Sequence, residues 1–245
     1  MKMVLNYLGA WLTTKRGIFL ILFVLIINSL FSSFLVGMSY FGRLLSDNAF
    51  EYVSTSEINN IRLRAQTGCG FHYWFMVALV YEGAYLFKQQ LFHRYMLNGY
   101  SRVQWGHFLL WAMATTALIL AIVQGLFINA MGWSMFGHQL GSVHLFATLG
   151  VLSLQAGVFG LLIVATFPHP TAPFVVFGWW VLELIITKEV IRDFLGPIPD
   201  YLPLESLDRW ARADEFSLNT SVPVVLYFSI SLIVFYSIIK RKSYA

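Results

Sequence analysis

The 245-residue chain carries very little charge. Charged side chains make up 11% of it, less than half of the roughly 25% found in soluble domains, whereas hydrophobic residues make up 58%. A water-soluble fold of this length could not cover its surface with so few charges, so lipid must solvate most of the chain. The same composition excludes intrinsic disorder and a DNA-binding domain. The single Cys69 excludes an internal disulfide scaffold.

Common enzymatic motifs are also missing from the sequence. There is no G-x-x-x-x-G-K-[ST], the loop that cradles nucleotide phosphates. There is no G-x-S-x-G nucleophile elbow and no H-E-x-x-H metal site. These absences argue against a self-contained ATPase and against an enzyme, so we predict no catalytic and no metal-ligating residue.

Long apolar stretches account for most of the chain. A membrane-spanning helix needs about 20 mostly apolar residues, and six stretches qualify, the fifth of them poorly. The fourteen residues of the fifth give about 21 Å of helix against a hydrocarbon core of about 30 Å. We predict an all-α, polytopic membrane protein forming a single domain. The expected spans are 17–38, 71–87, 107–129, 141–167, 174–187 and 221–239.

The charges between the spans predict the orientation. If the N-terminus is inside, the inner segments hold nine Lys and Arg and no acidic residue, whereas the outer segments hold seven basic and ten acidic residues. Positive residues in short segments beside span ends favour the cytoplasmic side. We therefore expect both termini in the cytoplasm, and contact of the basic side with anionic lipid.

Residues 1–16 have an amphipathic pattern. Apolar side chains recur there at helical spacing: Met3, Val4, Tyr7, Leu8, Trp11 and Leu12. This periodicity predicts a helix lying in the inner interface, with Lys15 and Arg16 anchoring its end. The alternative is a plain basic flank before the first span.

The cytoplasmic segment 88–106 is amphipathic as well. Its apolar face at helical spacing consists of Leu91, Phe92, Tyr95 and Met96. Gly99 is typical of a helix end, because glycine accepts the left-handed conformation there, and Ser101 is a suitable N-cap for the next helix. We predict a short helix across the cytoplasmic ends of the second and third spans. The alternative is an ordinary loop anchored by Arg94 and Arg102.

The region after the short fifth span is unusual. Charged residues at helical spacing and then prolines follow it: Lys188, Glu189, Arg192, Asp193, Pro197, Pro199 and Pro203. This pattern predicts a broken or re-entrant region before the last span, and such backbone needs protein or a water-filled cavity around it. Two acids fall within spans. Each is either structural or functional. Lys88 and the inner interface offer a structural explanation for Glu82, and snorkelling offers one for Glu183, which is the better functional candidate because it precedes the broken region.

The histidines allow a different interpretation. His72 and His144 would lie near the outer ends of spans two and four, and His107 and His169 near the inner ends of spans three and four. A two-haem cytochrome b places its ligands in this way, and imidazole suits haem iron. Histidine at helix ends is also commonplace, so a haem-binding redox protein is kept as the alternative.

A resemblance enters at the segment between spans two and three. Gly99, Ser101-Arg102 and Gly106 match a Gly, Ser/Thr-Arg and Gly-Lys pattern that opens span three in many permeases, with His107 standing where Lys is common. With the predicted topology, this resembles the transmembrane subunit of type-2 ATP-binding-cassette exporters, which include drug, antibiotic-peptide and polysaccharide exporters. An aromatic-proline segment often seen before the last span is also present: Tyr201-Leu202-Pro203.

The resemblance implies a permease that pairs with a second permease subunit, identical or different, in the bacterial inner membrane. ATP and Mg would bind separate ATPase subunits, and this chain would hold no cofactor. The implied coupling residues are Leu91, Phe92, Arg94, Tyr95, Met96, Gly99, Ser101 and Arg102. The implied translocation pathway includes Glu183, Lys188 and Glu189. A membrane scaffold without transport activity is a third hypothesis.

Overall fold

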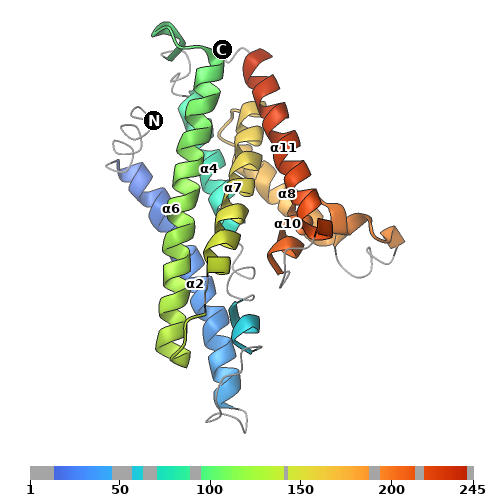
Figure 1. The fold of residues 1–245 in the computed structure, drawn as a ribbon. Helices are drawn as coiled ribbons and strands as arrows, with labels where there is room; N and C mark the ends of the chain where they lie inside the picture. The colour runs from blue at the N-terminus through green and yellow to red at the C-terminus, as the bar shows by residue number, and fades with distance from the viewer. Residues whose placement is uncertain are drawn as a thin grey trace.

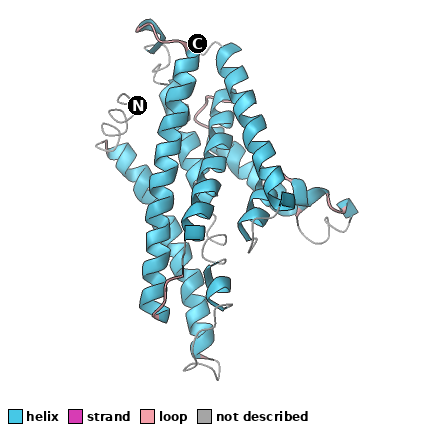
Figure 2. Ribbon diagram, in the orientation of Figure 1, coloured by secondary structure: helices cyan, strands magenta, loops and turns pink. Residues whose placement is uncertain are grey.

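The fold was obtained as a computed structural model, and the structure describes residues 14–45, 57–62, 71–88, 95–140, 143–187, 194–212 and 218–241. Within these ranges the chain is helices joined by turns, and no strand occurs (Figure 2). Six apolar helices correspond to the six predicted spans: α2 (Lys15–Leu44), α4 (Phe71–Lys88), α6 (Arg102–Phe136), α7 (Val143–Thr166), α8 (Ala172–Ile186) and α11 (Leu218–Arg241).

Four of the described helices are long and apolar enough to cross a membrane: α2, α6, α7 and α11. The all-α prediction is therefore confirmed for the described residues, and the length and composition of these four helices agree with a membrane protein. The six-span count and the side of the termini stay predictions. α8 has 15 residues, as expected for the short fifth stretch. α6 has 35 residues and is about 52 Å long, so it extends past a hydrocarbon core at its ends.

The helix bounds differ from the predicted ones where polar residues continue a helix beyond the apolar stretch. α6 begins at Arg102 rather than at residue 107, so residues 102–106 of the predicted cytoplasmic segment belong to a span-forming helix. α2 continues to Leu44. Apolar composition predicts only the part of a helix that lies in lipid. Backbone hydrogen bonding allows the same helix to continue through polar residues into the interface. Residues 1–13, which hold nearly all of the predicted interfacial helix, lie outside the described residues.

α7 is the central helix of the bundle (Figure 1) and packs against α4, α6, α8 and α11. Small residues make this possible, because they let helix backbones approach closely. A Cβ on Gly160 would lie 2.9 Å from a methyl carbon of Leu79 on α4, and a Cβ on Gly157 would collide with Met113 on α6. The outer faces of α2, α6 and α11 instead expose apolar side chains such as Phe34, Trp111 and Ile233, as a lipid-facing surface should.

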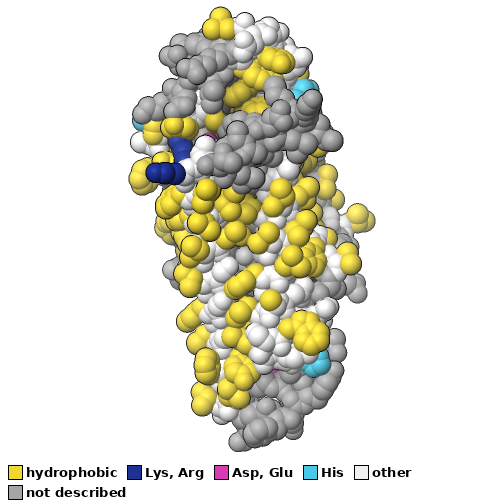
Figure 3. Space-filling view, turned by 90° about the vertical axis from the view of Figure 1, so that its left-hand side faces the viewer, with side chains coloured by type: hydrophobic (Ala, Val, Ile, Leu, Met, Phe, Trp, Pro, Cys, Tyr) yellow, Lys and Arg dark blue, Asp and Glu magenta, His cyan; other side chains and the backbone are white. Residues whose placement is uncertain are grey.

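Basic residues gather at one end of the bundle. Arg16, at the start of α2, pairs with Glu82 near the end of α4, with Nε 2.8 Å from Oε2. Arg102, at the start of α6, donates to the carbonyl of Lys240 near the end of α11 at 3.1 Å. We call this the basic end. In Figure 3 the dark-blue side chains lie above a surface in which yellow hydrophobic side chains predominate.

The described chain between α8 and α11 projects to the side of the bundle (Figure 1). A 3-10 turn, η1 (Ile198–Tyr201), leads into the short helix α10 (Pro203–Arg212). α10 buries one face, including Leu207 and Trp210, and packs against α7 and α11. The described part of the predicted broken region, residues 194–212, is therefore a 3-10 turn followed by an amphipathic helix held against protein, whereas residues 188–193 lie outside the described residues.

Candidate functional site

Residues 95–101 are the described part of the segment between α4 and α6. They contain the end of a short helix at the position predicted for it. We call residues 95–101 the connector. Gly99 has φ +82°, and its N–H donates to the Met96 carbonyl at 3.0 Å. The next amide, of Tyr100, donates to the Tyr95 carbonyl at 3.4 Å. Only glycine adopts this positive φ without steric cost, so the turn depends on Gly99.

Ser101 caps α6, as its sequence position predicts. Gln104 N donates to Ser101 Oγ at 3.2 Å, and Ser101 N donates to Gln104 Oε1 at 2.7 Å. Each side chain thus satisfies an amide that the first helical turn leaves without an intrahelical partner. The connector therefore leads directly into a capped first turn of α6.

Aromatic rings attach the connector to the bundle. The Tyr95 ring stacks on Tyr100, with centroids 4.3 Å apart, and lies 5.1 Å from the ring of Trp105. Trp105 in turn stacks on Phe108 at 5.3 Å, and both are buried. Met96 also packs against the core. Tyr95 and Met96, expected on the shared apolar face, therefore face the bundle.

The outward side of the connector shows Leu97, which is 85% exposed, beside Asn98 and Gly99. Sequence analysis did not single out Leu97. It directly follows Met96, the last residue of the predicted apolar face, and whether it is exposed depends on where the helical turn ends. Arg102 lies on α6 and is occupied with the Lys240 carbonyl. The remaining predicted coupling residues, Leu91, Phe92 and Arg94, lie outside the described residues.

A second contact at the basic end joins α6 to α11. The Tyr236 hydroxyl lies 2.7 Å from Nδ1 of His107. Gly106 allows the approach, since a Cβ there would lie 3.2 Å from Tyr236 Cε1. His107, one of the predicted haem candidates, is thus engaged with the last helix.

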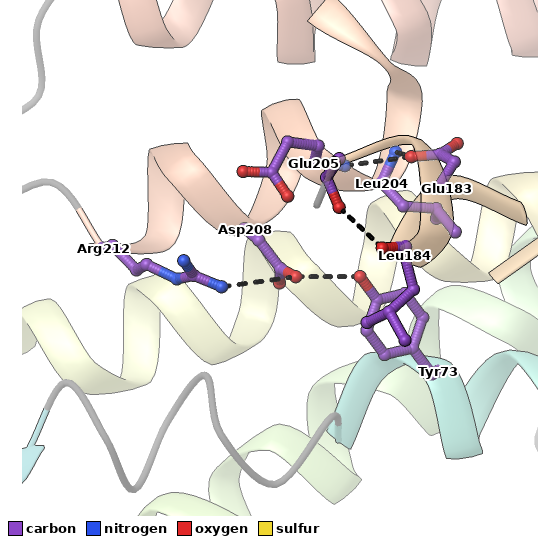
Figure 4. A network of polar contacts seen from close by, with 8 residues as sticks. Tyr73, Glu183, Leu184, Leu204, Glu205, Asp208 and Arg212 are labelled. Atoms are coloured by element: carbon purple, nitrogen blue, oxygen red, sulfur yellow. Dashed lines mark hydrogen bonds and ion pairs between the residues drawn. The ribbon is translucent and has the colours of Figure 1, made fainter. Parts of the chain in front are cut away.

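Glu183 lies at the junction of α8 and α10 (Figure 4). Its Oε2 accepts hydrogen bonds from Leu204 N at 2.9 Å and Glu205 N at 3.1 Å, while Trp179 Nε1 donates to Oε1. The side chain is 5% exposed. It therefore caps the first turn of α10 from another helix, where the helix dipole also favours a negative charge.

A second polar contact joins α10 to α4 (Figure 4). The Tyr73 hydroxyl donates to Asp208 Oδ2 at 2.9 Å, and Arg212 lies 3.9 Å from the same oxygen. The Tyr73 ring stacks on Trp180 of α8, with centroids 5.0 Å apart. Two carboxylates thus hold α10 between α4 and α8. Sequence analysis missed Asp208, whose partner lies 135 positions away.

Of the predicted translocation residues, the structure places Glu183 at this junction, and Lys188 and Glu189 lie outside the described residues. Glu82, the other acid within a predicted span, pairs with Arg16, in line with the structural explanation given for it above. Both acids therefore meet positively polarised groups of this chain, as an acid in a membrane requires.

The described histidines have ordinary partners. His169 Nδ1 lies 2.8 Å from Thr171 Oγ1, and His144 Nδ1 lies 3.4 Å from Thr148 Oγ1. The side chain of His72 lies outside the described residues. Among the residues that the structure describes, no group of three or more His, Cys, Asp or Glu is arranged to hold a metal ion.

Comparisons of the chain with protein-family models, with curated proteins and with solved structures find no match.

Proposed function

We propose that this chain is the permease subunit of an ATP-binding-cassette transporter, moving a substrate across the membrane with a second permease subunit and separate ATPase subunits. Supporting this proposal are six apolar helices, a capped connector at the basic end, and an amphipathic helix before the last helix. The resemblance at Gly99, Ser101 and Arg102 supplies the family.

The connector is the observation that carries the proposal. Its inner side packs on Trp105 and Phe108 through Tyr95, while Leu97 points away from the bundle. A leucine that is 85% exposed at a basic membrane boundary suits a partner in water better than lipid. An ATPase that binds this side would displace the connector, and the Ser101 cap would pass the displacement to α6. ATP bound to the ATPase can favour one state of the permease only if the contacts between the ATPase and the connector differ between the two states.

Two matched substitutions test the proposal. Leu97 and Val143 are both apolar and 85% exposed, and Val143 begins α7 at the end of the bundle opposite the basic end. We expect Leu97→Asp to abolish co-purification of an ATPase, and the ATPase activity of the purified complex, while Val143→Asp leaves both unchanged. An unaffected complex in a folded Leu97→Asp protein would refute the coupling role.

Glu183 enters this proposal because it holds α10 at the end of the short helix α8. A helix in that position can line a vestibule of the translocation pathway. Glu183→Gln keeps an acceptor for the two amides but removes the charge. We expect it to reduce transport in a folded protein. Normal transport by that variant would remove Glu183 from the translocation pathway and leave it as a helix cap.

A further inference from the structure

A narrow apolar slot runs between α2, α4, α6 and α7. Its walls extend from Leu86 to Phe75 on α4 and from Leu109 to Leu120 on α6. Each wall covers eleven helical steps, or about 16 Å at the rise of an α-helix. That length matches half of a hydrocarbon core of about 30 Å, which is the depth of one leaflet. The centre of a water-sized sphere can occupy about 80 Å³ of the slot, which over this length averages to a tube about as wide as one unbranched chain.

Water is a poor occupant of this slot. Only two of its lining residues are polar, Glu82 and Thr116. Thr116 Oγ1 donates to the Ala112 carbonyl of its own helix at 2.8 Å, and Glu82 pairs with Arg16. A buried water needs two to four polar partners, whereas cavities lined by apolar side chains stay dry and take apolar ligands. In a membrane, the abundant apolar ligand is an acyl chain.

Positive charge lies where the slot approaches the basic end. Leu20 lines the slot and lies one helical turn beyond Arg16 on α2, so the two share a face. Lys15 is exposed beside it. Lys15 and Arg16 together exceed the charge of Glu82 by one. Basic sites between membrane helices attract anionic headgroups.

We propose that the slot binds one acyl chain of an anionic phospholipid, with the phosphate beside Lys15 and Arg16. The bound lipid would fill the space between α2 and the α4–α6 pair, which the described side chains around it leave open. This inference rests on the chain lying in a membrane and not on the transport function, so each can fail without the other.

A larger side chain that fills the slot tests the inference. Ala112 lines the slot, and Ala130 is exposed on the same helix outside it. Native mass spectrometry of the full chain with dioleoyl-phosphatidylglycerol should show one retained lipid fewer for Ala112→Phe than for Ala130→Phe or the original protein. Equal lipid retention by a folded Ala112→Phe protein would overturn the proposal.

The headgroup is tested separately. Lys15→Gln should reduce the preference for dioleoyl-phosphatidylglycerol over dioleoyl-phosphatidylcholine about fivefold, and Lys15→Arg should keep it. An unchanged preference in Lys15→Gln would overturn the placement of the phosphate.

A third measurement needs no variant. Phosphatidylglycerol with a diazirine in its acyl chain is photolysed in liposomes that contain the original protein. Met113 lines the slot and is 3% exposed, whereas Leu118 is 45% exposed on the outer face of α6. Adducts on Met113 support the inference. Adducts confined to outward residues such as Leu118 contradict it, whether or not Ala112→Phe folds.

Discussion

The carboxylate of Glu183 accepts a hydrogen bond of 2.9 Å from the backbone amide of Leu204, so a residue of α8 caps a helix that begins twenty residues later. The chain between them makes a turn with Gly196 at φ +62°. Because the first amides of a helix have no intrahelical acceptor, α10 depends on α8 for its start. The two helices are therefore expected to move together.

The first prediction concerns this cap. Glu183→Ala would leave the buried Leu204 amide and its neighbour without an acceptor, at a cost of about 1–3 kcal/mol. We expect faster hydrogen exchange of the first α10 amides and a lower melting temperature in detergent. Glu183→Gln should show a smaller effect, since its amide oxygen still accepts. Unchanged exchange in Glu183→Ala would mean that the cap does not hold α10.

The second prediction concerns the other attachment of α10. Tyr73→Phe keeps the ring that stacks on Trp180 but removes the hydroxyl that donates to Asp208. A hydrogen bond to a charged group contributes about 1.5–3 kcal/mol, so α10 amides should exchange faster. Arg209→Gln serves as the control, because its pair with Asp200 involves a side chain that is 44% exposed and such pairs contribute little. Equal exchange in both variants would contradict the prediction.

The third prediction concerns the connector turn. Gly99→Ala should destabilise the protein by about 1–2 kcal/mol, the cost of a left-handed conformation for a residue with a Cβ. Gly178, inside α8, has no atom within 4 Å of a Cβ position and no positive φ. Gly178→Ala should be neutral or stabilising by up to about 1 kcal/mol. We expect Gly99→Ala to have a lower melting temperature than Gly178→Ala. The reverse order would contradict the prediction.

The fourth prediction concerns the contact of α4 with α7. A Cβ on Gly83 would lie 2.9 Å from Cγ2 of Val164, a branched side chain with little freedom to move. Gly83→Ala should therefore destabilise the protein by about 1–3 kcal/mol. At Gly150 the nearest atom, of Leu118, is 3.7 Å away, an ordinary contact, so Gly150→Ala should be tolerated. Similar melting temperatures for both would show that α4 and α7 separate easily.

The approximate positions of the six apolar helices could be predicted from the sequence, because a long apolar stretch indicates a helix that can cross a membrane. The short fifth helix and its prolines predicted the broken region, and Gly99 and Ser101 predicted the turn and the cap, since these are local properties of glycine and serine. The start of α6 was predicted five residues late, because Arg102 to Gly106 are helical while only partly apolar. The exposure of Leu97 was not predicted, because local periodicity does not say which side of a turn faces away from the bundle.

The sequence by itself determined that this is a helical membrane protein, because 11% charge and six apolar stretches leave lipid as the only suitable solvent. Only the tertiary structure decided the partners of its acids. Glu82 meets Arg16, Glu183 meets the amides of α10, and Asp208 meets Tyr73. Each pair joins residues distant in sequence, and only helix packing brings their polar atoms close enough to offset the cost of burying charge.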